Sequence, residues 1–180
     1  MVSKTYDIID AWKYNSFVEN SNGLTGKNNP VLTYSSDGVL IGGNNRWKYL
    51  YVTEHIPKEC IIEFTFTGYI SSQSWGNIGF TIGESINVDG SNEIMSAWHE
   101  KGNNDWKYYL KNTSPMYFSN QSEPALNSKI KIELTSTNIK FYINDTLIGT
   151  VANNNSTINP YFAFMTYYTL RVKDLIIKQL

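Results

Sequence analysis

Short stretches in which apolar and polar residues alternate run through most of the chain. In the clearest of them, Lys129-Ile130-Lys131-Ile132-Glu133-Leu134-Thr135, the branched apolar side chains share one face and the charged ones share the other. Alternation with a period of two is typical of a β-strand with one buried face. The pattern resumes in residues 139–143 and 146–151, on either side of Asn144-Asp145, a pair that favours a tight hairpin turn. We therefore expect an antiparallel meander of three strands.

Alternation, or in some segments a run of β-prone residues, predicts strands along the rest of the chain. They cover residues 38–41, 49–53, 61–67, 77–83, 93–100, 106–111, 161–166 and 170–178. Turn-forming residues separate them, and no stretch of ten or more residues shows a convincing helical stripe. Many short strands with frequent turns indicate a sandwich or a barrel. The predicted fold class is all-β, a two-sheet antiparallel β-sandwich.

Length and composition narrow the class of protein. The 180 residues suit one domain spanning 1–180, and 14% aromatic content excludes intrinsic disorder. With 15 cationic and 16 anionic residues and no run of Lys or Arg, a nucleic-acid partner is not expected. No apolar run approaches the roughly 18–20 residues of a membrane span, and the N-terminus lacks the apolar core of a signal peptide. The lone Cys60 permits no internal disulfide and is predicted to be a buried hydrophobe.

The order of five segments carries a family resemblance. The segment DGVLIGG (37–43) precedes IIEFTFTGY (61–69) and the glycine-punctuated NIGFTIG (77–83), and KIKIELTSTNIKFYINDTLIGTV (129–151) and LRVKDLIIKQL (170–180) come later. Together they resemble the concanavalin A-like lectin/glucanase superfamily, most specifically in the C-terminal part of the chain. The resemblance implies a jelly roll with one convex and one concave sheet. Many such concave sheets bind glycans, although a fold alone does not give function.

Residues suited to a glycan gather between positions 71 and 111. Aromatic rings suit the flat C–H faces of sugars, and amide, carboxylate and imidazole groups suit their hydroxyls. If Ile78, Phe80 and Ile82 face the core, strand parity turns Trp75, Trp98 and Tyr109 outward as one aromatic platform on the concave sheet. The competing interpretation is ordinary core packing, because a register shift of one residue reverses every face. The predicted ligand-binding residues are Trp75, Asn77, Trp98, His99, Glu100, Asn103, Asn104 and Tyr109.

Catalytic patterns are missing from the sequence. Retaining glycosidases need two carboxyls about 5–5.5 Å apart, and the glucanases of the resembled family carry alternating acids in an E-x-D-x-x-E run. Here the carboxylates are scattered singly, and neither His55 nor His99 accompanies a nucleophile motif. We expect no catalytic residue and no enzyme activity. A pair formed by folding, such as Glu100 with Asp105, stays open.

A metal site is not expected either. Residues 87–93 place oxygen donors at alternate positions, as Ca²⁺ would require. The stretch lacks the glycine at the sixth position and the distal bidentate Glu of an EF-hand, so a polar loop is the better interpretation. No cofactor is predicted, and Ca²⁺ elsewhere in a jelly roll stays open.

The sequence thus predicts a non-catalytic carbohydrate-binding module that recognises a cell-surface or cell-wall glycan. One alternative is a structural module of a virion fibre or surface protein, with its aromatic residues buried against neighbouring subunits. Another is a glycoside hydrolase with an unrecognised carboxylate pair. The expected partners are a glycan or polysaccharide and, in a phage tail, virion or cell-surface assembly, further copies of the chain. The expected location is a virion or the extracellular surface.

Overall fold

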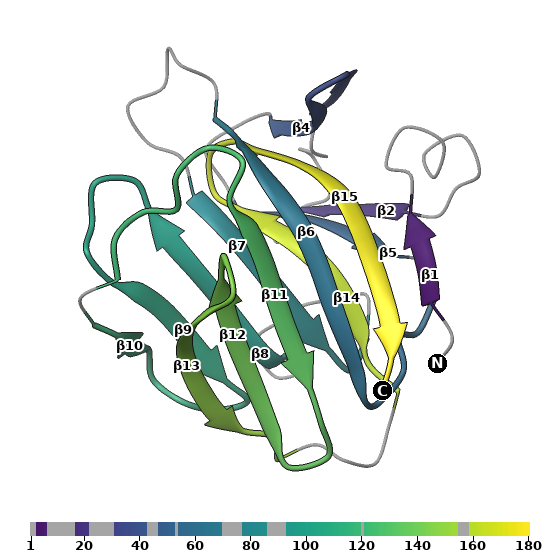
Figure 1. Ribbon diagram of the computed structural model, residues 1–180, viewed down its shortest axis with the longest axis vertical. Helices are drawn as coiled ribbons and strands as arrows, with labels where there is room; N and C mark the ends of the chain where they lie inside the picture. Colours follow the sequence, from purple (N-terminus) through teal and green to yellow (C-terminus); the bar gives the residue numbers. More distant parts are fainter. Residues whose placement is uncertain are drawn as a thin grey trace.

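The protein is a sandwich of two antiparallel sheets, with eight strands in one and seven in the other (Figure 1). The computed structural model describes residues 3–6, 17–21, 31–42, 47–52, 54–69, 77–85, 93–119, 121–154 and 159–180. Within these ranges every regular element is a strand. The predicted all-β, two-sheet architecture is confirmed.

The eight-stranded sheet contains the predicted meander at one edge. Its order is β13 (Thr146–Ala152), β12 (Asn138–Ile143), β11 (Lys129–Leu134), β6 (Cys60–Gly68), β15 (Leu170–Gln179), β4 (Gly38–Gly42) and β3 (Val31–Ser35), and β1 (Ser3–Tyr6) also pairs with β15. Asn144 and Asp145 form the turn between β12 and β13, with φ of 48° and 63°. Positive φ at both positions is the property of a type I′ turn, which matches the twist of the two strands. The predicted hairpin is confirmed.

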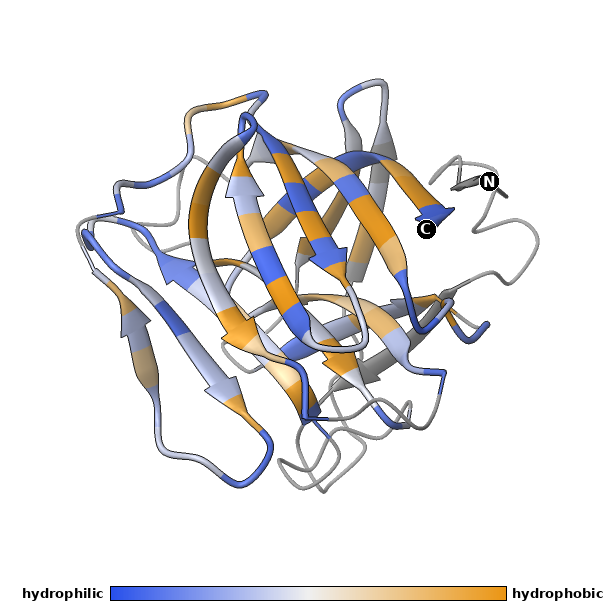
Figure 2. Cartoon of the chain, turned by 60° about the horizontal axis from the view of Figure 1, so that its bottom comes forward, coloured by the Kyte–Doolittle hydropathy of each residue, from blue (hydrophilic) through white to orange (hydrophobic). Residues whose placement is uncertain are grey.

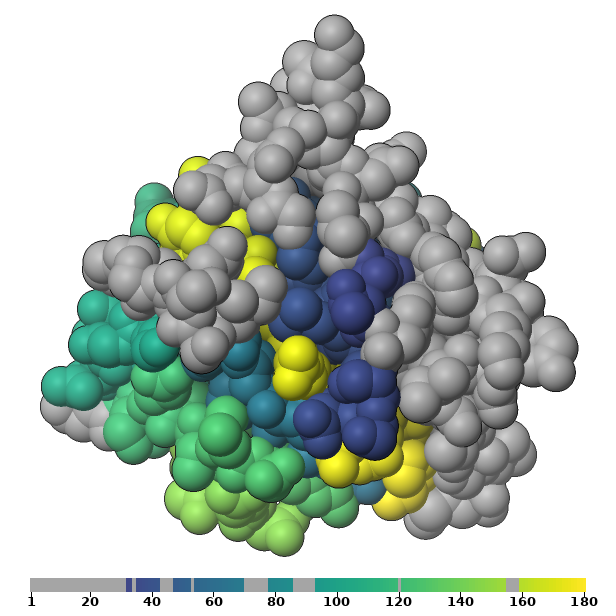
Figure 3. Space-filling view, turned by 90° about the horizontal axis from the view of Figure 1, so that it is seen from above, coloured from purple at the N-terminus to yellow at the C-terminus, as the bar shows by residue number. Residues whose placement is uncertain are grey.

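The seven-stranded sheet brings together segments from distant parts of the chain. Its order is β10 (Met116–Phe118), β9 (Trp106–Leu110), β8 (Glu93–Glu100), β7 (Asn77–Gly83), β14 (Tyr161–Thr166), β5 (Lys48–Val52) and β2 (Phe17–Ser21). In this sheet β14 lies between β7 and β5, which come much earlier in the chain. The other sheet likewise pairs β4 with β15, and Figure 3 shows these two segments adjacent in dark blue and yellow. The strand order therefore depends on long-range pairing.

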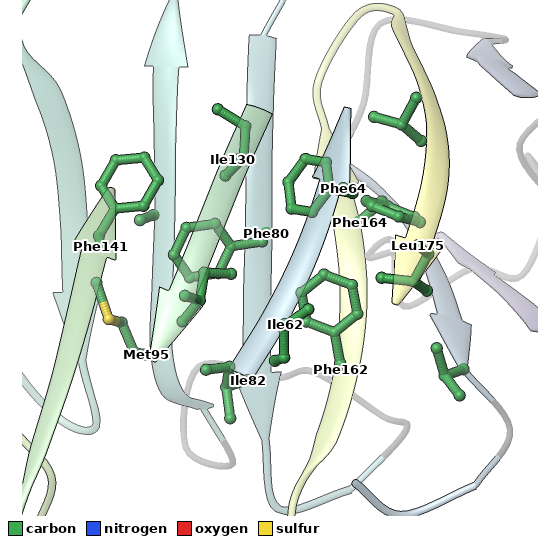
Figure 4. Close-up of a cluster of buried hydrophobic side chains, with 14 of the residues drawn as sticks. Ile62, Phe64, Phe80, Ile82, Met95, Ile130, Phe141, Phe162, Phe164 and Leu175 are labelled. Carbon is green, nitrogen blue, oxygen red and sulfur yellow. The ribbon is translucent and has the colours of Figure 1, made fainter. Parts of the chain in front are cut away.

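The core lies between the sheets and consists of the apolar alternates of both (Figure 4). Phe64 of β6 meets Phe164 of β14 edge to face, with ring centroids 5.0 Å apart, so the pair links the two layers. Cys60 is fully buried at the start of β6, as predicted, and burial raises the pKa of its thiol to about 12. It behaves as a small apolar side chain rather than a reactive one.

The outer faces of the two sheets differ in chemistry. In the eight-stranded sheet, strands such as β11 alternate apolar and polar residues (Figure 2). Its outer face carries ion pairs such as those of Glu63 with Lys129 and Lys178. The seven-stranded sheet instead carries a second apolar cluster on its outer face. We call this group the aromatic cluster: Tyr49, Tyr51, Trp98, Ala163 and Met165, with Trp47, Tyr109 and Tyr161 packed against it. The first five members are buried, and the three rings packed against them are only partly buried, so the candidate site begins at these three rings.

Candidate ligand-binding site

The register of the seven-stranded sheet arranges the aromatic cluster in two rows across five strands. Successive partners from β5 to β9 are Tyr51, Ala163, Thr81, Ser96 and Tyr109 in one row, and Tyr49, Met165, Gly79, Trp98 and Lys107 in the next. The middle position of each row, on β7, is a small residue, Thr81 or Gly79. The aromatic residues lie toward the two ends, on β5 and on β8 or β9. The predicted outward orientation of Trp98 and Tyr109 is confirmed.

Trp98 is the central ring of the cluster. It stacks on Tyr109, with centroids 5.1 Å apart and planes 19° from parallel, and Trp47 meets it edge to face at 5.2 Å. Only 6% of Trp98 is exposed, whereas Tyr109 and Trp47 are half-buried. The expectation of Trp98 as an open platform is therefore wrong, because neighbouring rings cover it. The accessible aromatic surface belongs to Tyr109 and Trp47.

A buried lysine secures the Trp47 side of the cluster. The Lys48 Nζ donates a hydrogen bond to the carbonyl oxygen of Tyr167 at 2.7 Å. Burial lowers the pKa of the Lys48 ammonium to about 8. The Tyr167 ring in turn lies 5.5 Å from the Trp47 ring, edge to face. The start of β5 and the segment after β14 thus hold Trp47 in place.

Gly79 lets the backbone of β7 pass close beneath Trp98. A Cβ at this position would lie 2.9 Å from the Trp98 Cβ and 2.9 Å from the carbonyl oxygens of Ala97 and Met165. These distances are shorter than van der Waals contact, so no larger residue fits without displacing a neighbour. Gly79 therefore serves the packing of Trp98.

Glu100 organises a polar group beside the aromatic cluster. Its Oε1 accepts hydrogen bonds from the Lys107 Nζ at 2.8 Å and the Trp98 Nε1 at 3.4 Å, and its Oε2 accepts one from the Asn103 Nδ2 at 2.8 Å. Partial burial would raise the pKa of the Glu100 carboxyl, but the hydrogen bonds and charge of Lys107, with those of Trp98 and Asn103, lower it. Asn104 is exposed in the same turn. The structure thus brings Glu100, Asn103 and Asn104 together, as the sequence predicts.

His99 does not belong to this face, and its prediction as a ligand contact is wrong. It lies between Trp98 and Glu100 on β8, so strand alternation points its side chain into the sandwich. There it is fully buried, 5.5 Å from the Trp106 ring, with its Nε2 3.2 Å from the Gln121 carbonyl oxygen. Burial lowers the pKa of the imidazole. The residue is a core histidine, out of reach of a ligand on the outer face.

One predicted site residue lies outside the described part of the chain, and for another only the backbone is described. Trp75 lies outside the described residues, and Asn77 is placed through its backbone, as the partner of Glu100 across β7 and β8. The sequence alone favours a structural role for Trp47, offers residues 46–49 only as the rim of a loop site, and does not connect Tyr51 with the aromatic face. The aromatic residues at 47, 49 and 51 alternate with period two, and that signal marks an aromatic face on one strand.

The described part of the chain contains no group of three or more His, Cys, Asp or Glu residues that could hold a metal ion. Of the oxygen-rich stretch 87–93, residues 87–92 lie outside the described residues, and Glu93 begins β8. Within the described ranges there is also no helix long and apolar enough to cross a membrane.

Similarity to known proteins is confined to three-dimensional structure. No protein-family model matches the chain. No curated protein matches its sequence. A protein of unknown function with a galectin-like fold from Bacillus subtilis is similar, with a TM-score of 0.63 and 9% identity over 99% of this chain and 98% of that one.

Two further solved structures are similar to the chain. The carbohydrate-binding module CBM66 from Bacillus subtilis has a TM-score of 0.59 and 12% identity over 85% of this chain and 94% of its own. The apo transglycosylase Crh5 has a TM-score of 0.67 and 12% identity over 99% and 85%. At such identities the likeness shows the fold alone. The chain has a galectin-like β-sandwich fold, which confirms the jelly roll that the sequence resemblance implied.

Proposed function

We propose that the protein is a non-catalytic carbohydrate-binding module whose glycan lies against Tyr109, Trp47 and the Glu100 group. The observation that carries the proposal is the aromatic cluster on one outer face of the sandwich, with hydrogen-bonding side chains directly beside it. The corresponding face of the other sheet bears paired charges instead.

The chemistry of the face matches that of a sugar. Half-buried Tyr109 and Trp47 offer ring surface to a C–H face, and Lys107 and Asn103 offer donors to hydroxyls. Trp98 contributes indirectly, since it fixes the plane of Tyr109 from below and donates to Glu100. A site held by packing in this way is largely preformed, which reduces the entropy lost on binding.

The state of Glu100 supports binding rather than hydrolysis. A general acid must carry a proton at the working pH, whereas hydrogen bonds from Lys107, Trp98 and Asn103 favour the ionised carboxylate. Both carboxylate oxygens already accept hydrogen bonds. The similar structures include a carbohydrate-binding module as well as a transglycosylase. The proposed setting is a cell or virion surface, where polysaccharides are exposed.

The test is a titration of the protein with a panel of cell-wall and storage polysaccharides, followed by intrinsic tryptophan fluorescence. We expect a saturable change with at least one polysaccharide, because the rings of Trp47 and Trp98 belong to the site. Tyr109→Ala should weaken binding by about 2- to 10-fold or more, the range of a lost aromatic contact of roughly 0.5–1.5 kcal/mol. Tyr109→Phe should retain most of the affinity.

Tyr142→Ala is the matched control, because Tyr142 is a half-buried tyrosine on the other sheet, in contact with Lys131. It should bind as the wild type does. A flat response across the panel would refute the proposal and favour the structural alternative, which sedimentation would test. Release of reducing sugar that disappears in Glu100→Gln would refute the non-catalytic assignment.

A further inference from the structure

A pocket of about 540 Å³ opens at one end of the sandwich. Its walls are residues 55–59 before β6, Ser136 in the turn after β11, Asn159 before β14, and Gln179 and Leu180 at the end of β15. This is the end marked C in Figure 1. The volume lies within the range of roughly 300–1,000 Å³ found for small-molecule sites. None of these residues belongs to the aromatic cluster or the Glu100 group.

Hydrogen bonds from three directions hold the pocket in shape. The Ile56 amide donates to the Pro160 carbonyl at 2.8 Å, and the Leu180 amide donates to the Glu59 carbonyl at 3.1 Å. The Ser136 amide donates to the Glu59 Oε1 at 3.0 Å. The loop before β6 is thereby fixed to three other segments. A pocket built from fixed backbone exists before its ligand arrives.

One wall is a histidine with a defined tautomer. The His55 Nδ1 lies 2.6 Å from the Asn159 carbonyl oxygen. A carbonyl only accepts, so Nδ1 carries the proton, and in the neutral ring Nε2 remains as an acceptor. The ring also lies against Tyr161, with centroids 4.0 Å apart. His55 is thus oriented by its neighbours and keeps an acceptor for a ligand.

The rest of the lining balances donors, acceptors and charge. Lys58 supplies an ammonium, Glu59 a carboxylate whose pKa is lowered by hydrogen bonds from Ser136, and Gln179 an amide that both donates and accepts. Adjacent opposite charges give neither an anion nor a cation an advantage. Half-buried Pro57 and exposed Leu180 add apolar surface. A neutral molecule with several hydroxyls and an apolar C–H face satisfies all of these groups.

We propose that this end pocket binds a neutral sugar unit, as a second site whose lining residues lie outside the aromatic cluster. A module with two glycan sites on different faces could engage two chains, or two parts of one chain, and gain avidity without new contacts at either site. The proposal concerns the pocket alone and stands whether or not the aromatic face binds a glycan.

The probes are glucose, galactose, mannose and N-acetylglucosamine, each titrated into the ¹⁵N-labelled protein. We expect saturable shifts of the backbone amides of residues 55, 56, 58 and 59, of Ser136 and of Gln179 with at least one sugar, and the same shifts in Tyr109→Ala. Gln179→Trp, which fills the pocket from an exposed position, should abolish them. Gln179→Ala should weaken the affinity by about 2- to 10-fold, as expected for one lost hydrogen bond.

Thr150→Trp on β13 is the matched control, since it adds an exposed tryptophan outside the pocket. It should leave the shifts unchanged, and thermal melts should show all variants folded. The proposal is overturned if none of the four sugars shifts these amides, or if the shifts persist in Gln179→Trp. Shifts at residues 100–110 alone would locate binding at the aromatic cluster and would equally refute the end pocket.

Discussion

The indole ring of Trp98 stacks on the phenol ring of Tyr109, although the two residues are not direct partners across their strands. Tyr109 pairs with Ser96, and Trp98 pairs with Lys107, so the rings meet along a diagonal. Aromatic side chains are long enough for such diagonal contacts, which stabilise neighbouring strands. The stack joins β8 and β9 on the outer face and presents the Tyr109 ring beside Lys107 and Glu100.

The close approach of β7 to Trp98 predicts the effect of Gly79→Ala. The added methyl would meet the Trp98 Cβ and two carbonyl oxygens at 2.9 Å, so Trp98 or the backbone must move. We expect the free energy of unfolding to fall by about 1–3 kcal/mol, as for other overpacked sites. Urea denaturation measures this change. Thr150→Ala, an exposed substitution on β13, should have no effect, and an unchanged denaturation midpoint for Gly79→Ala would contradict the packing described.

The contact between Gly149 and Phe118 closes the sandwich along one edge. Gly149 lies on β13 of one sheet, Phe118 on β10 of the other, and a Cβ at Gly149 would overlap the Phe118 ring. Gly149→Ala should therefore destabilise the protein by about 1–3 kcal/mol. In a Phe118→Leu background the same substitution should cost less, because the smaller side chain leaves room. Equal costs in both backgrounds, measured by thermal denaturation, would argue against this contact.

The Glu63 ion pairs predict a contribution to stability that is lost in acid. Burial alone would raise the pKa of the Glu63 carboxyl, but Lys178 at 2.6 Å and Lys129 at 3.1 Å lower it. A carboxyl with a lowered pKa in the folded state stabilises the protein above its unfolded pKa of roughly 4.3, and this contribution disappears as the pH falls through the folded value.

Glu63→Gln should therefore reduce the free energy of unfolding by about 1–3 kcal/mol at neutral pH. The difference from wild type should shrink once the pH falls below roughly 4. Glu133→Gln is the control, because the Glu133–Lys140 pair is more exposed and should contribute only about 0–1 kcal/mol. Denaturant unfolding at a series of pH values gives both quantities, and a pH-independent difference for Glu63→Gln would rule out the electrostatic explanation.

The buried imidazole of His99 predicts a second loss of stability in acid. Its cause is the burial of a group that cannot easily become charged, rather than the loss of an ion pair. Burial lowers its pKa in the folded protein, so below roughly pH 6.5 the unfolded chain takes up a proton that the folded one resists. Stability should fall as the pH drops from about 7 toward the folded pKa. His99→Phe keeps a ring against Trp106 and should flatten this part of the stability curve. An NMR titration in which His99 of the folded protein protonates at or above pH 6.5 would contradict the prediction.

The strands most easily recognised in the sequence are those with a full alternating period. Residues 77–83 were predicted with the bounds that the structure has, because Ile78, Phe80 and Ile82 alternate with small or polar residues. Residues 161–166 were also predicted with the correct bounds, from a run of β-prone residues rather than from alternation. β10, at Met116–Phe118, is only three residues long and lies at a sheet edge, so it has too few positions to display a period. β1, β2 and β3 are also short and were not predicted.

The sequence by itself determined the longer strands and the face that each of their side chains takes, since the period of two is a property of local backbone geometry. It therefore assigned Trp98 and Tyr109 to one face, and the same rule excludes His99 from it. Only the tertiary structure decided that β5 and β14 lie in the same sheet as β7 and β8, which places Trp47 against Trp98 and limits the exposure of that ring. Strand order and burial depend on packing between segments far apart in the chain, and no local sequence pattern encodes that packing.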